Sequence, residues 1–540
     1  MTSEIRYDRQ VRLWGDEGQS CIESANVCVL GSSALACEII KNLVLAGINS
    51  VHIIDNAVIT VPDLGSNFFL DNEIGHSRAE VALRSLMELN PSVKGSFDFR
   101  HIDDVLAENE NFLLKFTVVI GCNLNIDTAV RINNLLFERN IPFVLARQTY
   151  GLIGFVQISV KEHTIINTHE ENAPPDLRLD RPIPALEKFL QSINLEEMEY
   201  DVHSHTPYLI LYMKALKLWR EKYGQNDFPD NHEKRKTFEA VFMSLRIPHP
   251  KTESLEEENF FEGRVALVRS LRRTTIPERV KELLNHPKAK EPNCSCFWIL
   301  VAALRRFAMT HEVLPVRGSL PDMISDSERY VHLTKIFRDK AKEDVKEVMG
   351  YACSIVEERN FPSDCIKYRD CEFFCKRAAF LGVQHGSSIM HQPKASLQAL
   401  FSELQNTTFQ THSVTGVPIM PPSVWFVLLR AIDRFYCEKL RYPGSSGVPC
   451  VIDSFDLKAR VVDLIEEAGI EDKEEMLKKI PLIAINEMCR YSASELHVIA
   501  SLIGGIAAQE VIKLITGQYI PLDNIFIFDG HTQNSQTYRF

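Results

Sequence analysis

The first 165 residues alternate between strand-like and helix-like segments, and this alternation constrains the fold more than any other feature. Helical patterns with one apolar face lie between the strand-like segments, at residues 34–46, 78–90 and 128–139. Short buried strands joined by helices are typical of a parallel sheet covered on both faces. We therefore expect a doubly wound, Rossmann-like α/β domain. Its strands are predicted at residues 26–31, 50–55, 97–102, 116–121 and 142–147, with one or two more at 151–161.

The character of the chain changes after about residue 165. A polar, proline-rich stretch leads into a long region that reads almost entirely as helix, and its longest pattern covers residues 328–358. Strand–helix character returns near Pro481, with a helix predicted at 496–515 and a strand at 524–528. The interpretation is one α/β domain interrupted by a large, mostly α-helical insertion. The domain occupies residues 1–165 and 483–540, and the insertion occupies residues 166–482.

Composition excludes several classes of protein. The chain has 540 residues, of which 45% are hydrophobic and 24% are charged, and its net charge is −12. These values are ordinary for a globular protein, and an acidic chain without a basic block is not expected to bind nucleic acid. The longest apolar runs, at 294–304 and 498–508, are shorter than the roughly 20 residues of a membrane-spanning helix. The 13 scattered cysteines and the polar N-terminus favour a soluble intracellular protein with free thiols.

The first predicted helix opens with an incomplete phosphate-binding loop. Dinucleotide-binding folds place the sequence G-x-G-x-x-G between the first strand and the first helix. Here Gly31 is present, while Ser33 and Ala36 stand at the other two glycine positions. Asp55 ends the second strand, where an acidic residue would hold a ribose. The loop is compatible with a working nucleotide site, but it favours the alternative, a Rossmann-like sheet that has lost its ligand.

Three motifs resemble those of the enzymes that activate ubiquitin-like proteins, which share the ThiF-type adenylation fold. The sequence YDRQVRLWG at residues 7–15 is similar to their opening signature, and IGGIAAQEVIK at 503–513 is similar to their closing helix. The middle motif, LPVRGSLPDMI at 314–324, resembles the regulatory subunits of neddylation activating enzymes, a group that includes the amyloid-precursor-binding protein. The resemblance extends in order over nearly the whole chain.

The sequence departs from the active members of this family where they handle ATP. Phe68 stands in place of an arginine that holds triphosphate, Arg78 in place of a lysine, and Ile126 in place of the aspartate that binds magnesium. A phenyl ring cannot replace a cation, and an isoleucine cannot coordinate a metal. No cysteine matches the segment that carries the family's nucleophile. The resemblance therefore implies that this chain binds no cofactor and no metal and is not an enzyme by itself. ATP and Mg²⁺ are expected in a partner subunit.

Three arginines near the start recur every third residue, at Arg6, Arg9 and Arg12. This spacing predicts three guanidinium groups on one face of a helix. The simplest account pairs them with surface carboxylates. The resemblance adds a second account, because the family's Tyr-x-Arg-Gln arginine reaches across a dimer to the nucleotide of the other subunit. In this chain that residue is Arg9, which is expected to act in trans on the partner's ATP.

An interface with a partner is predicted at residues 322–335 and around His205. The segment mixes apolar with charged side chains, as interfaces do. The alternative is an ordinary helix start that packs within its own domain. The predicted interface consists of His205, Asp322, Met323, Ile324, Ser325, Asp326, Ser327, Glu328, Arg329, Tyr330, Val331, His332, Leu333, Thr334 and Lys335.

The resemblance implies the regulatory subunit of a heterodimeric enzyme that activates the modifier of the neddylation pathway. Its catalytic partner would adenylate this ubiquitin-like modifier and then capture it on a cysteine. Two alternatives are a pure scaffold or adaptor and an independent nucleotide-dependent adenylyltransferase. The expected partners are the catalytic subunit, the modifier and the tail of the amyloid precursor protein. We expect a cytoplasmic protein that also reaches the nucleus, and membrane association cannot be read from the sequence.

Overall fold

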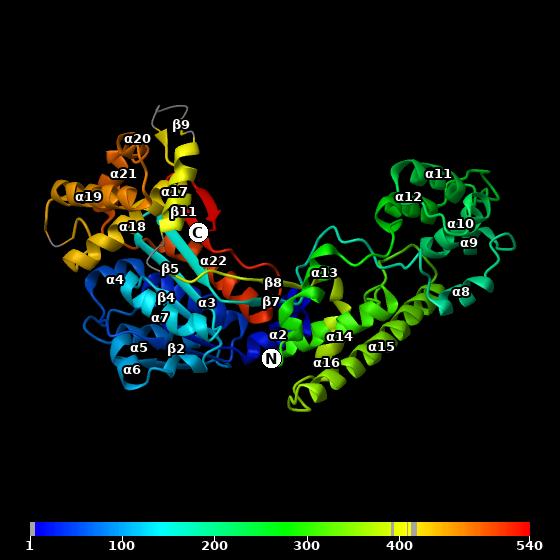
Figure 1. Cartoon of the computed structure of the whole chain (residues 1–540), viewed down its shortest axis with the longest axis horizontal. Helices are drawn as coiled ribbons and strands as arrows, with labels where there is room; N and C mark the ends of the chain where they lie inside the picture. The colour runs from blue at the N-terminus through cyan, green and yellow to red at the C-terminus, as the bar shows by residue number, and fades with distance from the viewer. Residues whose placement is uncertain (1–5, 390–393, 408, 412–417, 446, 540) are drawn as a thin grey trace. The chain divides into compact units, whose positions relative to one another are not determined.

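The computed structural model describes residues 6–389, 394–407, 409–411, 418–445 and 447–539 (Figure 1). The chain divides into two units. Unit 1 comprises residues 1–163 and 383–540, and unit 2 comprises residues 164–382. The chain thus returns to unit 1 at Val383 rather than at residue 483, so the predicted end of the insertion is wrong.

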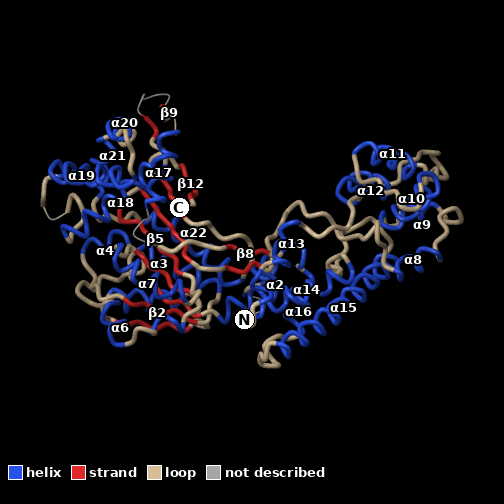
Figure 2. Tube along the Cα trace, viewed as in Figure 1, coloured by secondary structure: helices blue, strands red, loops and turns tan. Residues whose placement is uncertain are grey.

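Unit 1 is built on an eight-stranded sheet with the strand order β12-β11-β6-β5-β4-β1-β2-β3. Figure 2 shows strands in red and helices in blue. Strands β1 to β5 run parallel to one another. The other three pair antiparallel: β6 with β5, β11 with β6, and β12 with β11. The Rossmann-like fold predicted from the sequence is confirmed. The bounds are β1 (Asn26–Leu30), β2 (Ser50–Ile54), β3 (Lys94–Asp98), β4 (Val118–Cys122), β5 (Phe143–Tyr150), β6 (Ile153–Ser159), β11 (Ile525–Asp529) and β12 (Asn534–Tyr538).

Strand β3 is displaced from the predicted segment 97–102. It lies at the edge of the sheet, and its side chains are mostly exposed. An exposed edge strand needs no apolar pattern, so the apolar side chains of Phe97 and Ile102 are misleading signals. Ile102 instead begins the short helix α6 (Ile102–Glu108), where its side chain is buried.

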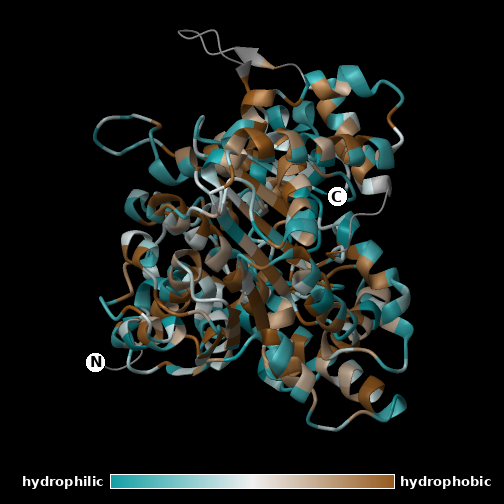
Figure 3. Cartoon of the chain, turned by 90° about the vertical axis from the view of Figure 1, so that its left-hand side faces the viewer, coloured by the Kyte–Doolittle hydropathy of each residue, from teal (hydrophilic) through white to brown (hydrophobic). Residues whose placement is uncertain are grey.

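One face of the sheet is covered by helices from both ends of the chain. Alternate side chains of the central strands, such as Val27 and Val29, pack there against the helices in one hydrophobic core. Figure 3 shows how strongly apolar residues concentrate along these inner elements. The helices are α2 (Asp8–Ser24), α3 (Ala34–Ala46), α5 (Arg78–Glu88) and α22 (His497–Thr516).

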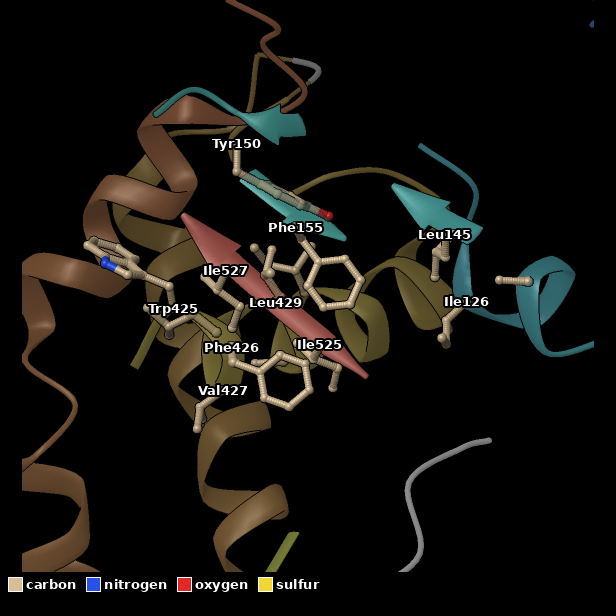
Figure 4. Close-up of a cluster of buried hydrophobic side chains, with 14 of the residues drawn as sticks. Ile126, Leu145, Tyr150, Phe155, Trp425, Phe426, Val427, Leu429, Ile525 and Ile527 are labelled. Carbon is tan, nitrogen blue, oxygen red and sulfur yellow. The ribbon is translucent and has the colours of Figure 1, made fainter. Parts of the chain in front are cut away.

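The opposite face explains why the insertion ends early. Phe426 stacks on Phe155 of β6 with ring centroids 6.0 Å apart, close to Ile525 and Ile527 of β11 (Figure 4). Helical periodicity shows that a segment is a helix but not which core it joins, and these helices join the sheet. They are α7 (Ile126–Glu138), α17 (Lys394–Asn406), α18 (Pro422–Lys439), α19 (Cys450–Ala468) and α21 (Leu482–Tyr491). Smaller elements of unit 1 are α4 (Val61–Ser66), η1 (Phe112–Lys115), β9 (Gln410–Thr411), β10 (Pro418–Ile419) and α20 (Lys473–Lys478).

Unit 2 is mainly helical, and its longest helix is α15 (Ser327–Glu358), close to the bounds predicted from periodicity. The apolar face of α15, including Leu333 and Phe337, is buried in the core of this unit. Strands β7 (His163–Ile165) and β8 (Gly382–Gln384) pair in a small sheet, and both boundaries between the units, after His163 and after Gly382, fall within these strands. The remaining elements are α8 (Pro184–Gln191), α9 (Tyr200–His203), α10 (Tyr208–Tyr223), α11 (His232–Met243), α12 (Glu258–Ser270), α13 (Glu278–Asn285), η2 (Pro287–Lys290), α14 (Cys296–His311), α16 (Tyr368–Lys376) and η3 (Ala378–Phe380).

Helix α22 is the one helix in the described ranges whose length and hydropathy would suffice to cross a membrane. Its apolar sequence has another explanation, because the helix packs along α3 inside unit 1. Ile503, Ala507 and Val511 are buried there. A Cβ atom added to Gly504 would lie 2.7 Å from the Cβ of Glu38, so the glycine permits this close approach. The apolar composition of α22 is therefore that of a core helix.

Candidate functional site

The incomplete phosphate loop lies where the Rossmann-like fold places it, between β1 and α3. Gly31 has φ +99°, and a Cβ atom there would lie 3.0 Å from the carbonyl oxygen of Cys122, so glycine is required. Ser33 is the N-cap of α3, and its hydroxyl accepts a hydrogen bond from the amide of Ala36. Gly31, Ser33 and Ala36 thus form one turn at the carboxyl ends of the parallel strands, which is the usual ligand edge of such sheets.

Asp55, the residue expected to hold a ribose, is engaged by the chain's own side chains. Its Oδ2 atom accepts hydrogen bonds from the Ser32 amide at 2.9 Å, the Ser32 hydroxyl and the Arg78 guanidinium at 3.0 Å. Arg78 also pairs with Asp63 at 3.0 Å. Burial alone would raise the pKa of Asp55, but the Arg78 cation and the hydrogen bonds outweigh it, and the net pKa is lowered. Asp55 is therefore an ionised anchor of the loop.

The Asp55–Arg78 pair gives a prediction about stability. Asp55→Asn is expected to destabilise the protein by about 2 kcal/mol at pH 7, because it weakens a mostly buried ion pair. Since the folded-state pKa of Asp55 is lowered, its contribution is present above its unfolded pKa of about 3.9 and is lost as the pH falls further. The gap in melting temperature between wild type and variant should thus narrow in acid. Asp71→Asn, which changes an exposed carboxylate, should cost much less.

A second carboxylate, Glu495, occupies the N-terminus of α3. Its Oε2 atom accepts a hydrogen bond from the Ala34 amide at 3.2 Å, and its Oε1 atom accepts one from the Asn123 side chain at 2.6 Å. The Asn123 amide also donates to the Ser33 hydroxyl at 3.1 Å. Burial raises the pKa of Glu495, against the opposing effect of these hydrogen bonds. A helix N-terminus in this place of the fold is where phosphate binds, and here a carboxylate of the same chain holds that position.

Sequence reasoning missed Glu495. The residue lies 461 positions from Ala34 in the chain and belongs to none of the three family motifs. Its only distinguishing signal is that it precedes the closing helix, and an acidic residue before a helix has an ordinary explanation in the helix dipole.

The other two positions that depart from active family members are now visible. The Phe68 side chain is 81% exposed, while its neighbour Asn67 is buried and donates to the Ser32 carbonyl at 3.3 Å. Ile126 begins α7 and is buried. Asp127, one residue further, accepts a hydrogen bond from the Cys437 thiol at 3.2 Å. Among the residues that the structure describes, no cluster of His, Cys, Asp and Glu has the geometry of a metal site.

Large apolar side chains are exposed on two segments beside this edge. The end of α4 and the start of α22 are neighbours, because the ring of His497 lies 3.1 Å from the carbonyl oxygen of Ser66. Val498 is 77% exposed. Exposed apolar groups gathered in this way are typical of a surface that another protein covers. We call this surface the apolar edge, and it consists of Phe68, Leu496, Val498 and Leu502.

The three N-terminal arginines do not share one helix face, so that prediction is wrong. Helix α2 begins at Asp8, and Arg6 lies before it with its guanidinium bonded to the carbonyl of Leu89 at 2.8 Å. Arg12 pairs with Asp8 at 3.1 Å. The side chain of Arg9 is 86% exposed and approaches Asp8 only to 3.9 Å. Arg6 is thus a structural residue, whereas Arg9 presents its cation to solvent.

The predicted interface segment divides into two groups. Several members serve unit 2 itself: Met323 and Leu333 are buried, and Asp326 caps α15 by accepting from the amide of Arg329 at 2.8 Å. The amide of Asp326 also donates to the carbonyl of His205. Ile324, Ser325, Arg329, Tyr330 and Thr334 are half-buried. The exposed members are His205, Asp322, Ser327, Glu328, Val331, His332 and Lys335.

All 13 cysteines are free thiols. Cys437 has an exposed position, but burial of its sulfur and the nearby Asp127 raise its pKa to about 12. A nucleophilic cysteine needs the opposite shift, toward the thiolate at neutral pH.

Comparison with known proteins gives consistent matches. A model of the ThiF family matches residues 7–540. The NEDD8-activating enzyme E1 regulatory subunit of Caenorhabditis elegans is 43% identical, with 99% of this chain and 98% of the relative covered. The protein of the same name from Xenopus laevis is 37% identical, with 99% and 98% covered. The NEDD8-activating enzyme E1 regulatory subunit AXL of Arabidopsis thaliana is 36% identical, with 99% of both chains covered.

Proposed function

The chain belongs to the ThiF family and, within it, to the NEDD8-activating enzyme E1 regulatory subunits, and on this basis we propose that it is the non-catalytic half of a heterodimer. In this proposal the catalytic subunit binds ATP and Mg²⁺, adenylates NEDD8 and captures it on a cysteine. This chain supplies a second α/β core, a helical unit and the cation of Arg9. Cytoplasmic and nuclear location and binding of the amyloid precursor protein tail stay predictions.

One observation carries the division of labour between the subunits. The anion position at the start of α3 is held by Glu495, and the ribose position at Asp55 is held by Arg78 and Ser32. A triphosphate placed here would meet a carboxylate where the fold normally offers free amide groups. These residues do not fit ATP, which argues against an independent adenylyltransferase.

The isolated chain is therefore expected to bind no ATP and to form no thioester with a ubiquitin-like protein. The reason is that the nucleotide positions are filled and that none of the family's nucleophile motif is present. Equilibrium dialysis with labelled ATP and a non-reducing gel after incubation with ATP, Mg²⁺ and modifier would check both points. The complete heterodimer is the positive control. Micromolar ATP affinity, or a reducible adduct on this chain without its partner, would favour the independent enzyme.

The exposed part of the interface segment allows a cleaner test than the segment as a whole. Reversing the charge of Asp326 would remove the N-cap of α15 and unfold the first turn of this helix. Asp322→Lys combined with Val331→Asp changes only exposed side chains and should weaken the heterodimer at least tenfold if this surface is covered by the partner. Analytical ultracentrifugation would measure the affinity. If the affinity were unchanged, Asp322 and Val331 would not lie in the interface with the catalytic subunit.

A further inference from the structure

Unit 2 contains a cavity of about 200 Å³ with an arginine-rich wall. Its lining comes from the segment before α8, the loop after α12, the segment before α15 and the turn η3, which all belong to this unit. Four cations face two anions, so the wall has an excess of two positive charges in a chain whose net charge is −12. The charged lining residues are Arg178, Arg272, Arg273, Arg317, Glu170 and Asp176.

The two acidic side chains are already engaged. Asp176 accepts hydrogen bonds from the Arg178 side chain at 2.7 Å and from the backbone amide of Arg317 at 3.1 Å. Glu170 pairs with Arg279. Arg178 is buried and fixed further by the carbonyl of Leu314 at 2.7 Å. Arg178 is therefore a rigid part of the wall rather than a mobile surface cation.

Arg317 and Arg272 differ from Arg178 because neither guanidinium group is paired with a carboxylate in the part of the chain that the structure describes. The Arg317 guanidinium donates to the carbonyl of Pro174 at 3.1 Å and lies 4.6 Å from the ring centroid of Phe380. Within the described ranges, no carboxylate forms an ion pair with Arg317 or Arg272. Burial is the main cause that lowers the pKa of Arg317; the Asp176 carboxylate opposes it, the Arg178 cation adds to it, and Glu170 opposes it more weakly. A partly buried cation beside a second cation is costly, and a bound anion would offset that cost.

We propose that this cavity binds a small phosphorylated metabolite, with Arg317 and Arg272 as its direct contacts and Arg178 as a fixed positive wall. Guanidinium groups suit phosphate because their paired N–H donors match two of its oxygens. A phosphate group near pH 7 carries close to two negative charges, which equals the excess of the wall. The cavity is smaller than the usual range for drug-sized ligands, so a compact ligand is favoured over a large cofactor.

The probe for this proposal is inorganic pyrophosphate, titrated into the full chain by calorimetry without Mg²⁺. We expect saturable binding of one equivalent that weakens as salt is raised. Arg272→Ala removes an exposed side chain and should weaken binding about tenfold. Arg317→Met, which keeps the packing on Phe380, should weaken it at least as much. Arg264→Ala deletes an exposed arginine of the same unit outside the cavity and is the matched control.

The outcomes separate the cavity from other anion sites on the chain. Retained affinity in both cavity variants would place pyrophosphate elsewhere, for example at the start of α3, and would overturn the proposal. No saturable binding up to about 1 mM would overturn it as well. Acetate that competes as strongly as phosphate would contradict the ligand class. Because Arg272 is exposed, its variant is expected to keep the melting temperature of the wild type, so that loss of binding cannot be attributed to unfolding.

Discussion

Arg9→Ala is expected to slow adenylate formation by the heterodimer by about a hundredfold while leaving the affinity between the subunits unchanged. Adenylation expels pyrophosphate, so negative charge grows on the leaving oxygens in the transition state. A guanidinium supplied from another subunit stabilises that charge, as arginine fingers do in phosphoryl transfer. The Arg9 side chain suits this role because it extends into solvent and has only a distant contact with Asp8.

The choice of control follows from the structure. Arg6 is unsuitable because it anchors the carbonyl of Leu89, so its loss would disturb the fold. Arg12 lies on the same helix and is exposed, and Arg12→Ala should leave the rate nearly unchanged. Arg9→Lys should restore only part of the rate, since a point charge lacks the bidentate fork. Pyrophosphate exchange measures all three variants. Equal rates for wild type and Arg9→Ala would reduce this chain to a scaffold.

Local sequence patterns predicted most of the strands and helices of unit 1. They failed where the position of an element depends on contacts with residues far away in the sequence. The central parallel strands are covered on both faces, so β1, β2 and β4 carry apolar runs that the sequence displays directly. Strand β3 lies at the edge and carries no such run. Helix α18 reads as a helix from its own residues, but its membership of unit 1 depends on contacts with β6 and β11 that periodicity does not encode.

The candidate site shows the same division. The loss of glycine at Ser33 and Ala36 can be read from the sequence because the loop is a local motif. The residue that occupies the loop cannot be predicted from the sequence, because Glu495 comes from the far end of the chain. The sequence shows Arg78 only as a replacement for a lysine, whereas its pairing with Asp55 and Asp63 depends on the fold.

The second prediction with a large expected effect concerns the apolar edge. Val498→Asp is expected to weaken the heterodimer by a hundredfold or more, and Phe68→Asp should act similarly. If the catalytic subunit covers this surface, each variant buries an unpaired carboxylate in an apolar contact, and such losses at the centre of an interface cost about 3 kcal/mol or more. Both side chains are exposed in the chain alone, so neither change should alter its melting temperature.

Met309→Asp is the matched control, because Met309 is 72% exposed and lies on α14 of unit 2, outside every surface proposed for the partner. Its affinity for the catalytic subunit should equal that of the wild type. The affinities of the three variants can be compared by sedimentation at the same salt concentration. If Val498→Asp bound the partner as tightly as Met309→Asp does, the apolar edge would not be the docking surface. The exposed residues of the segment 322–335 would then be the other candidate docking surface, for which Asp322 and Val331 provide the corresponding test.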